Sequence, residues 1–88
     1  MVKIEKEKYP SVVDFGNSNA KFYGWAFYGF KRVGCVYKFN DGGYSFIEDF
    51  DRKRHNKETR PCSIISRNLK DLKEMINGYY QYMEVQNA

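Results

Sequence analysis

The tetrapeptide Asn40-Asp41-Gly42-Gly43 separates two runs that are rich in aromatic and β-branched residues. Asp-Gly favours the tight turn of a β-hairpin, because both residues tolerate the left-handed backbone angles that such turns require. The flanking runs, residues 33–40 and 44–51, lack proline and have the composition of strands. A hairpin at this point predicts an antiparallel sheet in the middle of the chain.

A third run of similar composition, residues 20–30, precedes the hairpin, and a reversal within residues 29–34 joins it to the next run. Three antiparallel strands in a meander are the simplest arrangement. Residues 62–65, which follow Pro61, are a candidate for a fourth short strand. Residues 1–19 form an N-terminal segment, irregular or a short strand, in which residues 11–15 are a candidate for a strand or one helical turn.

The C-terminal part of the chain has the pattern of an amphipathic helix. Asn68 suits the N-cap position, and Asp71 in the first turn favours the helix dipole. Apolar residues then recur at helical spacing: Leu69, Leu72, Ile76, Tyr79 and Met83. Gly78 either marks a close contact with the sheet or, with Asn77, ends the helix early. The sequence predicts one α+β domain over residues 20–88, a three- or four-stranded antiparallel meander with one C-terminal helix packed on one face.

The positions of the turns decide which side chains share a face of the sheet. An even-numbered loop at Lys31-Arg32 and a two-residue turn at Asp41-Gly42 gather one largely apolar set, the predicted core: Phe22, Tyr28, Phe30, Val33, Tyr37, Phe39, Tyr44, Phe46 and Phe50. The opposite face then carries Tyr23, Trp25, Phe27, Val36, Lys38, Asn40, Ser45, Ile47 and Asp49. A one-residue slip in either turn exchanges the faces for one strand.

The second face is a candidate binding surface. Tyr23, Trp25 and Phe27 form a row on its first strand, with Lys38 expected across from Trp25. Uncovered rings of this kind stack on bases or anchor a protein interface, and a lysine beside them can meet a phosphate. Two structural alternatives remain open: the N-terminal segment folds over the rings, or two copies of the chain pack face to face as a homodimer.

Positive charge is concentrated in one stretch of a chain whose net charge is +4. Five of its 15 cationic residues lie within residues 52–60: Arg52, Lys53, Arg54, Lys57 and Arg60. A flexible basic loop suits phosphate contacts, which need charge more than fixed geometry. The alternative is a solvated connection whose charges serve solubility, partly neutralised by neighbouring acidic residues.

Catalytic and metal-binding patterns are weak in this sequence. Cys35, His55 and Cys62 are the only cysteine and histidine residues, and their spacing matches no zinc motif. His55 is the sole histidine, so a histidine pair is impossible, although a lone His55 among cations could act on RNA. We therefore expect no catalytic residues, no metal and no cofactor.

The N-terminus alternates in charge and lacks the apolar core of a signal peptide, and no run has the length of a membrane span. These features predict a cytoplasmic protein with reduced cysteines and no membrane partner. No small-molecule substrate is evident from the sequence.

Together these features favour a small non-catalytic binding module that docks on nucleic acid, or on a nucleic-acid-handling protein, through the aromatic face and the basic loop. The alternative is a pure protein-interaction module, such as a small inhibitor or accessory subunit of the phage type, that blocks an acidic or nucleic-acid-binding groove. A small ribonuclease toxin is the third hypothesis.

Overall fold

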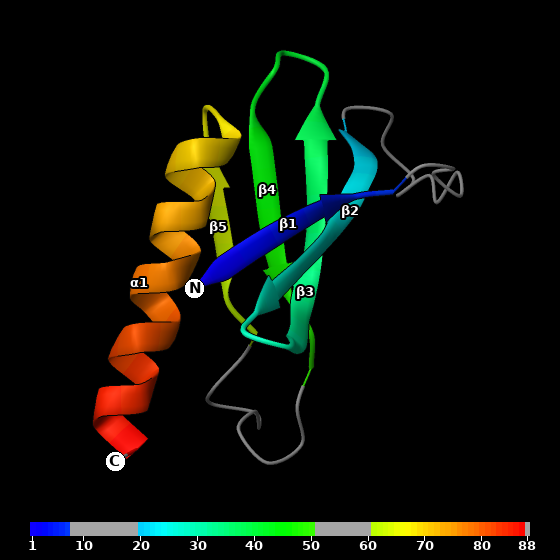
Figure 1. The fold of residues 1–88 in the computed structure, drawn as a ribbon. Coiled ribbons are helices and arrows are strands. Elements are labelled where there is room, and N and C mark those ends of the chain that lie inside the picture. The colour runs from blue at the N-terminus through cyan, green and yellow to red at the C-terminus, as the bar shows by residue number, and fades with distance from the viewer. Residues whose placement is uncertain (8–19, 51–60, 88) are drawn as a thin grey trace.

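The fold is given by a computed structural model that describes residues 1–7, 20–50 and 61–87 (Figure 1). These residues form an antiparallel meander with strand order β1-β2-β3-β4-β5, followed by one helix. The elements are β1 (Val2–Lys6), β2 (Ala20–Tyr28), β3 (Lys31–Phe39), β4 (Tyr44–Glu48), β5 (Ser63–Ser66) and α1 (Leu69–Asn87). The predicted α+β class is confirmed, and the sheet has five strands where three or four were expected.

The additional strand is β1, which comes from the N-terminal segment. β1 pairs with β2, from Val2 opposite Tyr28 to Lys6 opposite Gly24. Val2 is buried and Ile4 packs against the core, whereas Lys3 and Glu5 are exposed. This alternation is the ordinary period of a half-buried strand. Residues 11–15, the candidate strand or helical turn, lie outside the described residues.

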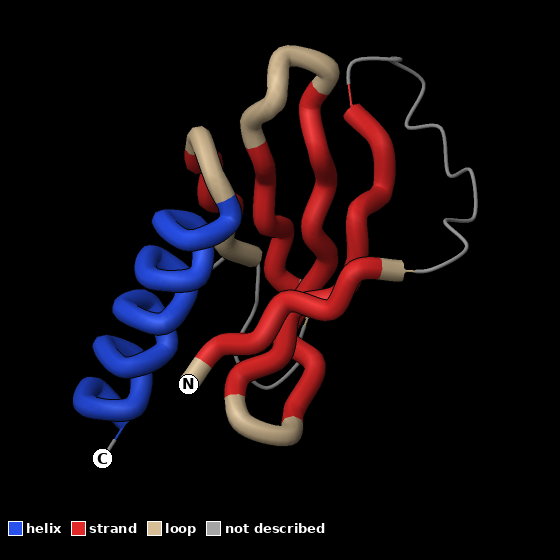
Figure 2. Tube along the Cα trace, turned by 45° about the horizontal axis from the view of Figure 1, so that its top comes forward, coloured by secondary structure: helices blue, strands red, loops and turns tan. Residues whose placement is uncertain are grey.

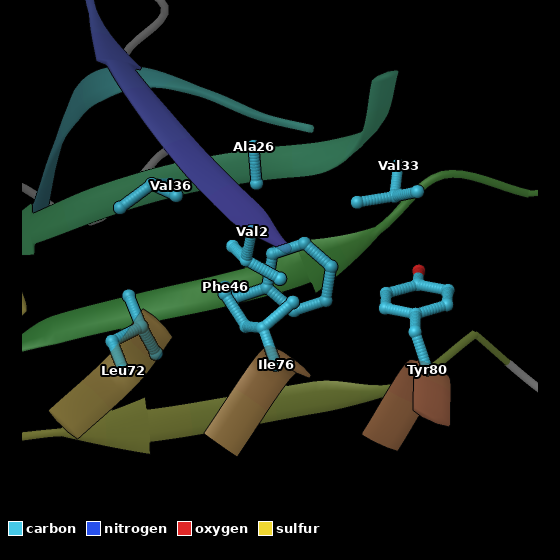
Figure 3. Packing of buried hydrophobic residues seen from close by; sticks show 8 residues of the cluster. All are labelled: Val2, Ala26, Val33, Val36, Phe46, Leu72, Ile76 and Tyr80. Carbon is cyan, nitrogen blue, oxygen red and sulfur yellow. The ribbon is translucent and has the colours of Figure 1, made fainter. Parts of the chain in front are cut away.

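The sheet and α1 enclose one core. β1 runs obliquely across the sheet, and α1 packs against β5, β1 and β4 (Figures 1 and 2). The buried side chains come from β1, β2, β3, β4 and α1 (Figure 3): Val2, Ala26, Val33, Val36, Phe46, Leu72, Ile76 and Tyr80. Burial of each large apolar side chain contributes roughly 1.5–3 kcal/mol. The helix therefore covers one face of the sheet, which we call the helix face, and the opposite side is the outer face.

The first hairpin turns at Gly29-Phe30, not at Lys31-Arg32 as predicted. Tyr28 pairs with Lys31, so the loop has two residues. Gly29 has a φ of 64°, and within residues 1–7, 20–50 and 61–87 no non-glycine residue has a positive φ, which matches a turn with glycine at its first central position. Lys31 and Arg32 belong to β3 instead, because neither residue readily adopts the required backbone angle.

The second hairpin is longer than predicted by one residue. Phe39 N–H donates to the carbonyl of Gly43 at 2.8 Å, and Gly42 N–H donates to the carbonyl of Phe39 at 3.0 Å. The loop thus has three residues and ends on Gly42, whose φ is 102°. Three-residue hairpin loops typically combine a type I turn with a following glycine in the left-handed region. The odd length pairs Lys38, not Phe39, with Tyr44, and this slip exchanges the faces of β4 relative to β3.

The predicted core face is therefore correct only in part. Val33 and Phe46 lie in the core, and Tyr28 and Tyr44 pack against it. Strand pairing places three other members on the outer face: Phe22, Tyr37 and Phe39. Phe30 and Phe50 are exposed, at 108% and 64%. Conversely, Val36, predicted for the second face, is fully buried in the core.

The helix begins as predicted. Asp71 N–H donates to Asn68 Oδ1 at 2.8 Å, and Asn68 Nδ2 donates to Asp71 Oδ2 at 3.2 Å, so the two side chains cap the first turn reciprocally. The helix continues past Gly78 to Asn87. Gly78 is exposed, and a Cβ atom added there would meet nothing within 4 Å. Neither interpretation of Gly78, close contact or early end, is correct.

Candidate functional site

The predicted row of rings on β2 is divided between the two faces. Trp25 and Phe27 pair with Cys35 and Arg32 on the outer face. Tyr23 instead packs against the core, because a bulge between Phe22 and Gly24 interrupts the alternation of β2. Lys38 also lies on the helix face, opposite Lys21 and Tyr44, rather than across from Trp25.

Trp25 is engaged by its neighbours on the outer face. The guanidinium of Arg32 lies 4.5 Å from the centre of the Trp25 ring, and Arg32 Nε is 3.1 Å from Asp49 Oδ2. The indole Nε1 donates to Glu7 Oε2 at 3.2 Å, and the Phe22 ring makes an edge contact at 5.0 Å. The ring is only partly exposed. These contacts make Trp25 part of a packed network that includes the Arg32–Asp49 ion pair and Glu7, which is unlike an open stacking platform.

Cys35 and Tyr37, which also lie on the outer face, are not activated for chemistry. Burial raises the pKa of the Cys35 thiol, and burial together with the neighbouring Cys35 and Asp49 raises the pKa of Tyr37 to about 12. Both groups therefore stay protonated at neutral pH, and Cys35 lacks the thiolate of a nucleophile. A hollow of about 220 Å³ beside them is lined by Ala20, Tyr37, Phe39, Ser45 and Ile47. None of these side chains is charged.

A different set of residues gathers on the helix face, at the end of the sheet where β3 leads into β4. We call it the lysine–tyrosine cluster, and it consists of Lys6, Lys21, Tyr23, Lys38 and Tyr44. The Tyr23 and Tyr44 rings meet edge to face, with centres 5.4 Å apart. Lys6 Nζ lies 5.8 Å from the centre of the Tyr23 ring, and Lys38 Nζ lies 5.8 Å from that of Tyr44. Both tyrosines are partly exposed, and all three lysines are exposed.

The charges of this cluster are of one sign. Lys21 and Lys38 are direct cross-strand partners. Like charges placed opposite each other destabilise a strand pair. Ion pairs join Lys3 to Glu5 and Arg32 to Asp49, whereas no described acid forms an ion pair with Lys6, Lys21 or Lys38. The arrangement concentrates positive charge beside two aromatic rings.

Local features of β1 and β2 build the cluster. The bulge separates Tyr23 from Trp25, and Tyr23 meets Tyr44 on the helix face. Gly24 follows the bulge and pairs with Lys6. A Cβ atom at Gly24 would overlap the backbone carbonyl of Glu5, so only glycine permits β1 to approach this closely. This approach brings Lys6 to the Tyr23 ring.

The predicted basic loop lies outside the described residues, as does His55. Its flanking residues, Phe50 and Pro61, follow β4 and precede β5. They therefore lie at the end of the sheet opposite the loop that joins β3 to β4 (Figure 1). Of the residues predicted as a binding site, the structure brings Tyr23 together with Lys38, and Trp25 together with Phe27, on opposite faces.

Glu48 is a buried acidic residue on the helix face, with 4% exposure. Its carboxyl oxygens accept hydrogen bonds from Tyr80 Oη at 2.7 Å, Tyr79 Oη at 3.2 Å and Cys62 N–H at 3.1 Å. These contacts join β4 to α1 and to the residue that precedes β5. Their geometry indicates a structural role.

Sequence reasoning missed three members of the cluster: Lys6, Lys21 and Tyr44. The signal was present in part, because Lys21 and Tyr23 are separated by one residue and Lys38 precedes the hairpin loop. The correct loop length would have placed Lys38 opposite Tyr44. The bulge at Tyr23 has a weak signal in the sequence, the isolated Gly24 within the strand run.

Metal binding and membrane insertion find no structural support in the described part of the chain. Across residues 1–7, 20–50 and 61–87, no three His, Cys, Asp or Glu side chains gather as a metal site requires. No described helix combines the length and apolar character needed to cross a bilayer. Comparisons with protein-family models, curated proteins and solved structures find no match to this chain.

Proposed function

We propose that this chain is a non-catalytic binding module for nucleic acid and that the lysine–tyrosine cluster is its contact surface. The observation that carries the proposal is the direct pairing of Lys21 with Lys38, with Lys6 on the same face and no described acid paired with any of the three. An external polyanion relieves this repulsion. The phosphates of nucleic acid supply closely spaced negative charge, and bases supply partners for tyrosine rings.

Binding of this kind depends on salt because each neutralised phosphate releases counterions. The logarithm of the association constant falls by about 0.7–0.9 per phosphate contact for each tenfold rise in salt. Contacts from three lysines therefore predict a slope of about −2 to −3. A basic stretch at residues 52–60 would steepen this slope if it also touches phosphate.

Fluorescence anisotropy with labelled DNA and RNA oligonucleotides, titrated at several salt concentrations, tests the proposal. Lys21→Gln and Lys38→Gln should each weaken binding and reduce the slope by about one. Lys3→Gln is the matched control, because Lys3 is exposed, pairs with Glu5 and lies opposite Phe27 on the outer side. Absence of binding to every oligonucleotide at low salt, or equal losses in all three variants, contradicts the proposal.

A specific observation favours a second candidate function, a protein-interaction module. Phe30 lies at the apex of the β2–β3 hairpin and is 108% exposed. The turn needs glycine at residue 29 but not phenylalanine at residue 30, so the fold does not account for this side chain. A fully exposed aromatic residue at the apex of a hairpin suits an apolar pocket on a partner protein.

The Phe30→Ser variant tests this second candidate. Its stability should stay within about 0.5 kcal/mol of the wild type, because the phenyl ring buries no surface. In a pull-down, a protein that the wild type retains at high salt and that Phe30→Ser does not retain supports the interaction. Identical retained proteins in both samples argue against it. We propose a cytoplasmic location for either function, in line with two cysteines that are not joined in a disulfide.

A further inference from the structure

We infer that the lysine–tyrosine cluster selects single-stranded nucleic acid, with a base stacked against the ring of Tyr44 or Tyr23. This inference rests on the proposed function and specifies its ligand. The preference for a single strand depends on the tyrosine rings, whereas the binding of nucleic acid in general depends on the lysine charges. The two can therefore fail separately.

The two rings form the floor of the cluster. Tyr23 and Tyr44 pack against the hydrophobic core and remain partly exposed, and their planes meet at 84°. Edge-to-face packing fixes each ring and leaves ring surface turned away from the partner. A ring that is already ordered loses little conformational freedom when a base stacks on it, which favours binding.

Lysine ammonium groups lie over these rings in the unbound protein. Lys6 is over Tyr23 and Lys38 is over Tyr44, each at 5.8 Å from the ring centre. An ammonium group on a long flexible side chain can exchange a weak contact with a ring for a stronger one with a phosphate. A base then takes the place over the ring. The same residues thus serve both parts of a nucleotide.

The bulge of β2 supports a role for Tyr23 beyond packing. Regular alternation would place Lys21, Tyr23 and Trp25 on one face, and the bulge leaves Lys21 and Tyr23 on the helix face while Trp25 lies on the outer face. Bulges disrupt strand pairing and recur where a side chain must be re-aimed at a site. Here the bulge separates Trp25 from Tyr23, which pairs with Tyr44 within a group of three cations.

Base stacking on these rings requires an unpaired strand. In a duplex each base is stacked on its neighbours, and its flat surfaces are not accessible to a protein side chain. The bases of a single strand can turn outward and stack on aromatic rings, whatever their sequence. A site built from lysines alone would bind duplex and single strand through phosphates without this preference.

The test compares three ligands of equal length and equal label: a single-stranded oligothymidine, the same strand paired with its complement, and a single strand of abasic nucleotides. All three carry phosphates, but only the first offers accessible bases. We expect the oligothymidine to bind on the order of 10-fold more tightly than either of the others. Equal affinity for the oligothymidine and the abasic strand, or tighter binding of the duplex, overturns the inference.

Protein variants give a second, independent measurement. Tyr44→Phe keeps the ring and should keep the preference for the oligothymidine, whereas Tyr44→Leu should lose most of it. Circular dichroism establishes whether each variant is folded. If Tyr44→Leu does not fold, the comparison of the three ligands with wild-type protein still tests the inference. An unchanged preference in a folded Tyr44→Leu and Tyr23→Leu pair overturns the inference. Failure of every ligand to bind contradicts the proposed function itself.

Discussion

The carboxyl group of Glu48 on β4 accepts a hydrogen bond from the hydroxyl of Tyr80 on α1, with 2.7 Å between the two oxygens. Glu48 is 4% exposed and Tyr80 is 5% exposed, so water does not replace this bond when it is lost. Tyr80 also stacks on Tyr28 of β2, with ring centres 5.3 Å apart. One tyrosine thus connects the helix to two strands of the sheet.

Tyr80→Phe should lower the free energy of unfolding by about 1–3 kcal/mol, because it leaves a buried oxygen of Glu48 without one of its donors. Urea denaturation followed by circular dichroism measures the change. Tyr82→Phe is the matched control, since Tyr82 is 61% exposed and its hydroxyl is within reach of water. Equal stability of the two variants would show that the Glu48 contact contributes little.

Gly24→Ala should disrupt the pairing of β1 with β2, because the added Cβ overlaps the Glu5 carbonyl. We expect a loss of stability of several kcal/mol, and weaker binding of nucleic acid through the displacement of Lys6. Gly78→Ala is a control of opposite sign. Gly78 is exposed within α1 and has open space around it, so alanine should raise stability by about 1 kcal/mol. Thermal unfolding of both variants decides the matter, and a neutral Gly24→Ala would contradict the close approach of β1.

The elements themselves were largely predictable from the sequence, because they follow from local chemistry. Asn68 and Asp71 cap the helix where expected, and strand composition marks three of the strands. The arrangement of side chains on faces was not predictable to the same degree. It depends on whether the loop before Gly43 has two or three residues, and Asp41-Gly42 is compatible with both. β1 was anticipated only as the short-strand alternative for residues 1–19, because its alternation covers only Val2–Lys6.

The candidate site shows the same division. Tyr23 and Lys38 were predicted as binding residues, and the structure gives them other neighbours than those expected. Trp25 was predicted as part of an uncovered row of rings, whereas in the structure it contacts Arg32, Glu7 and Phe22. Long-range contacts of this kind depend on register and on a bulge, and neither is encoded by residue type alone.

The stability of the protein should fall as pH rises above the range of an ordinary tyrosine. The pKa of Tyr37 is raised to about 12 from 10.0, first by burial and then by Cys35 and Asp49. Between about pH 10 and 12 the unfolded chain releases this proton while the folded chain keeps it, so unfolding becomes more favourable with pH. Each pKa unit corresponds to about 1.4 kcal/mol. Urea denaturation at increasing pH should show a shallower decline for Tyr37→Phe, and an identical decline would contradict the burial of Tyr37.

Trp25 provides a spectroscopic report on which face of the sheet binds nucleic acid. It is the only tryptophan of the chain and lies on the outer face, whereas the lysine–tyrosine cluster lies on the helix face. Binding at the cluster should therefore leave tryptophan emission nearly unchanged while anisotropy of the labelled oligonucleotide rises. Arg32→Ala serves as the control for sensitivity, because removal of the guanidinium from the ring should shift the emission toward that of a solvated indole. Quenching of Trp25 in proportion to bound oligonucleotide would place the bases on the outer face and would contradict the cluster as the site.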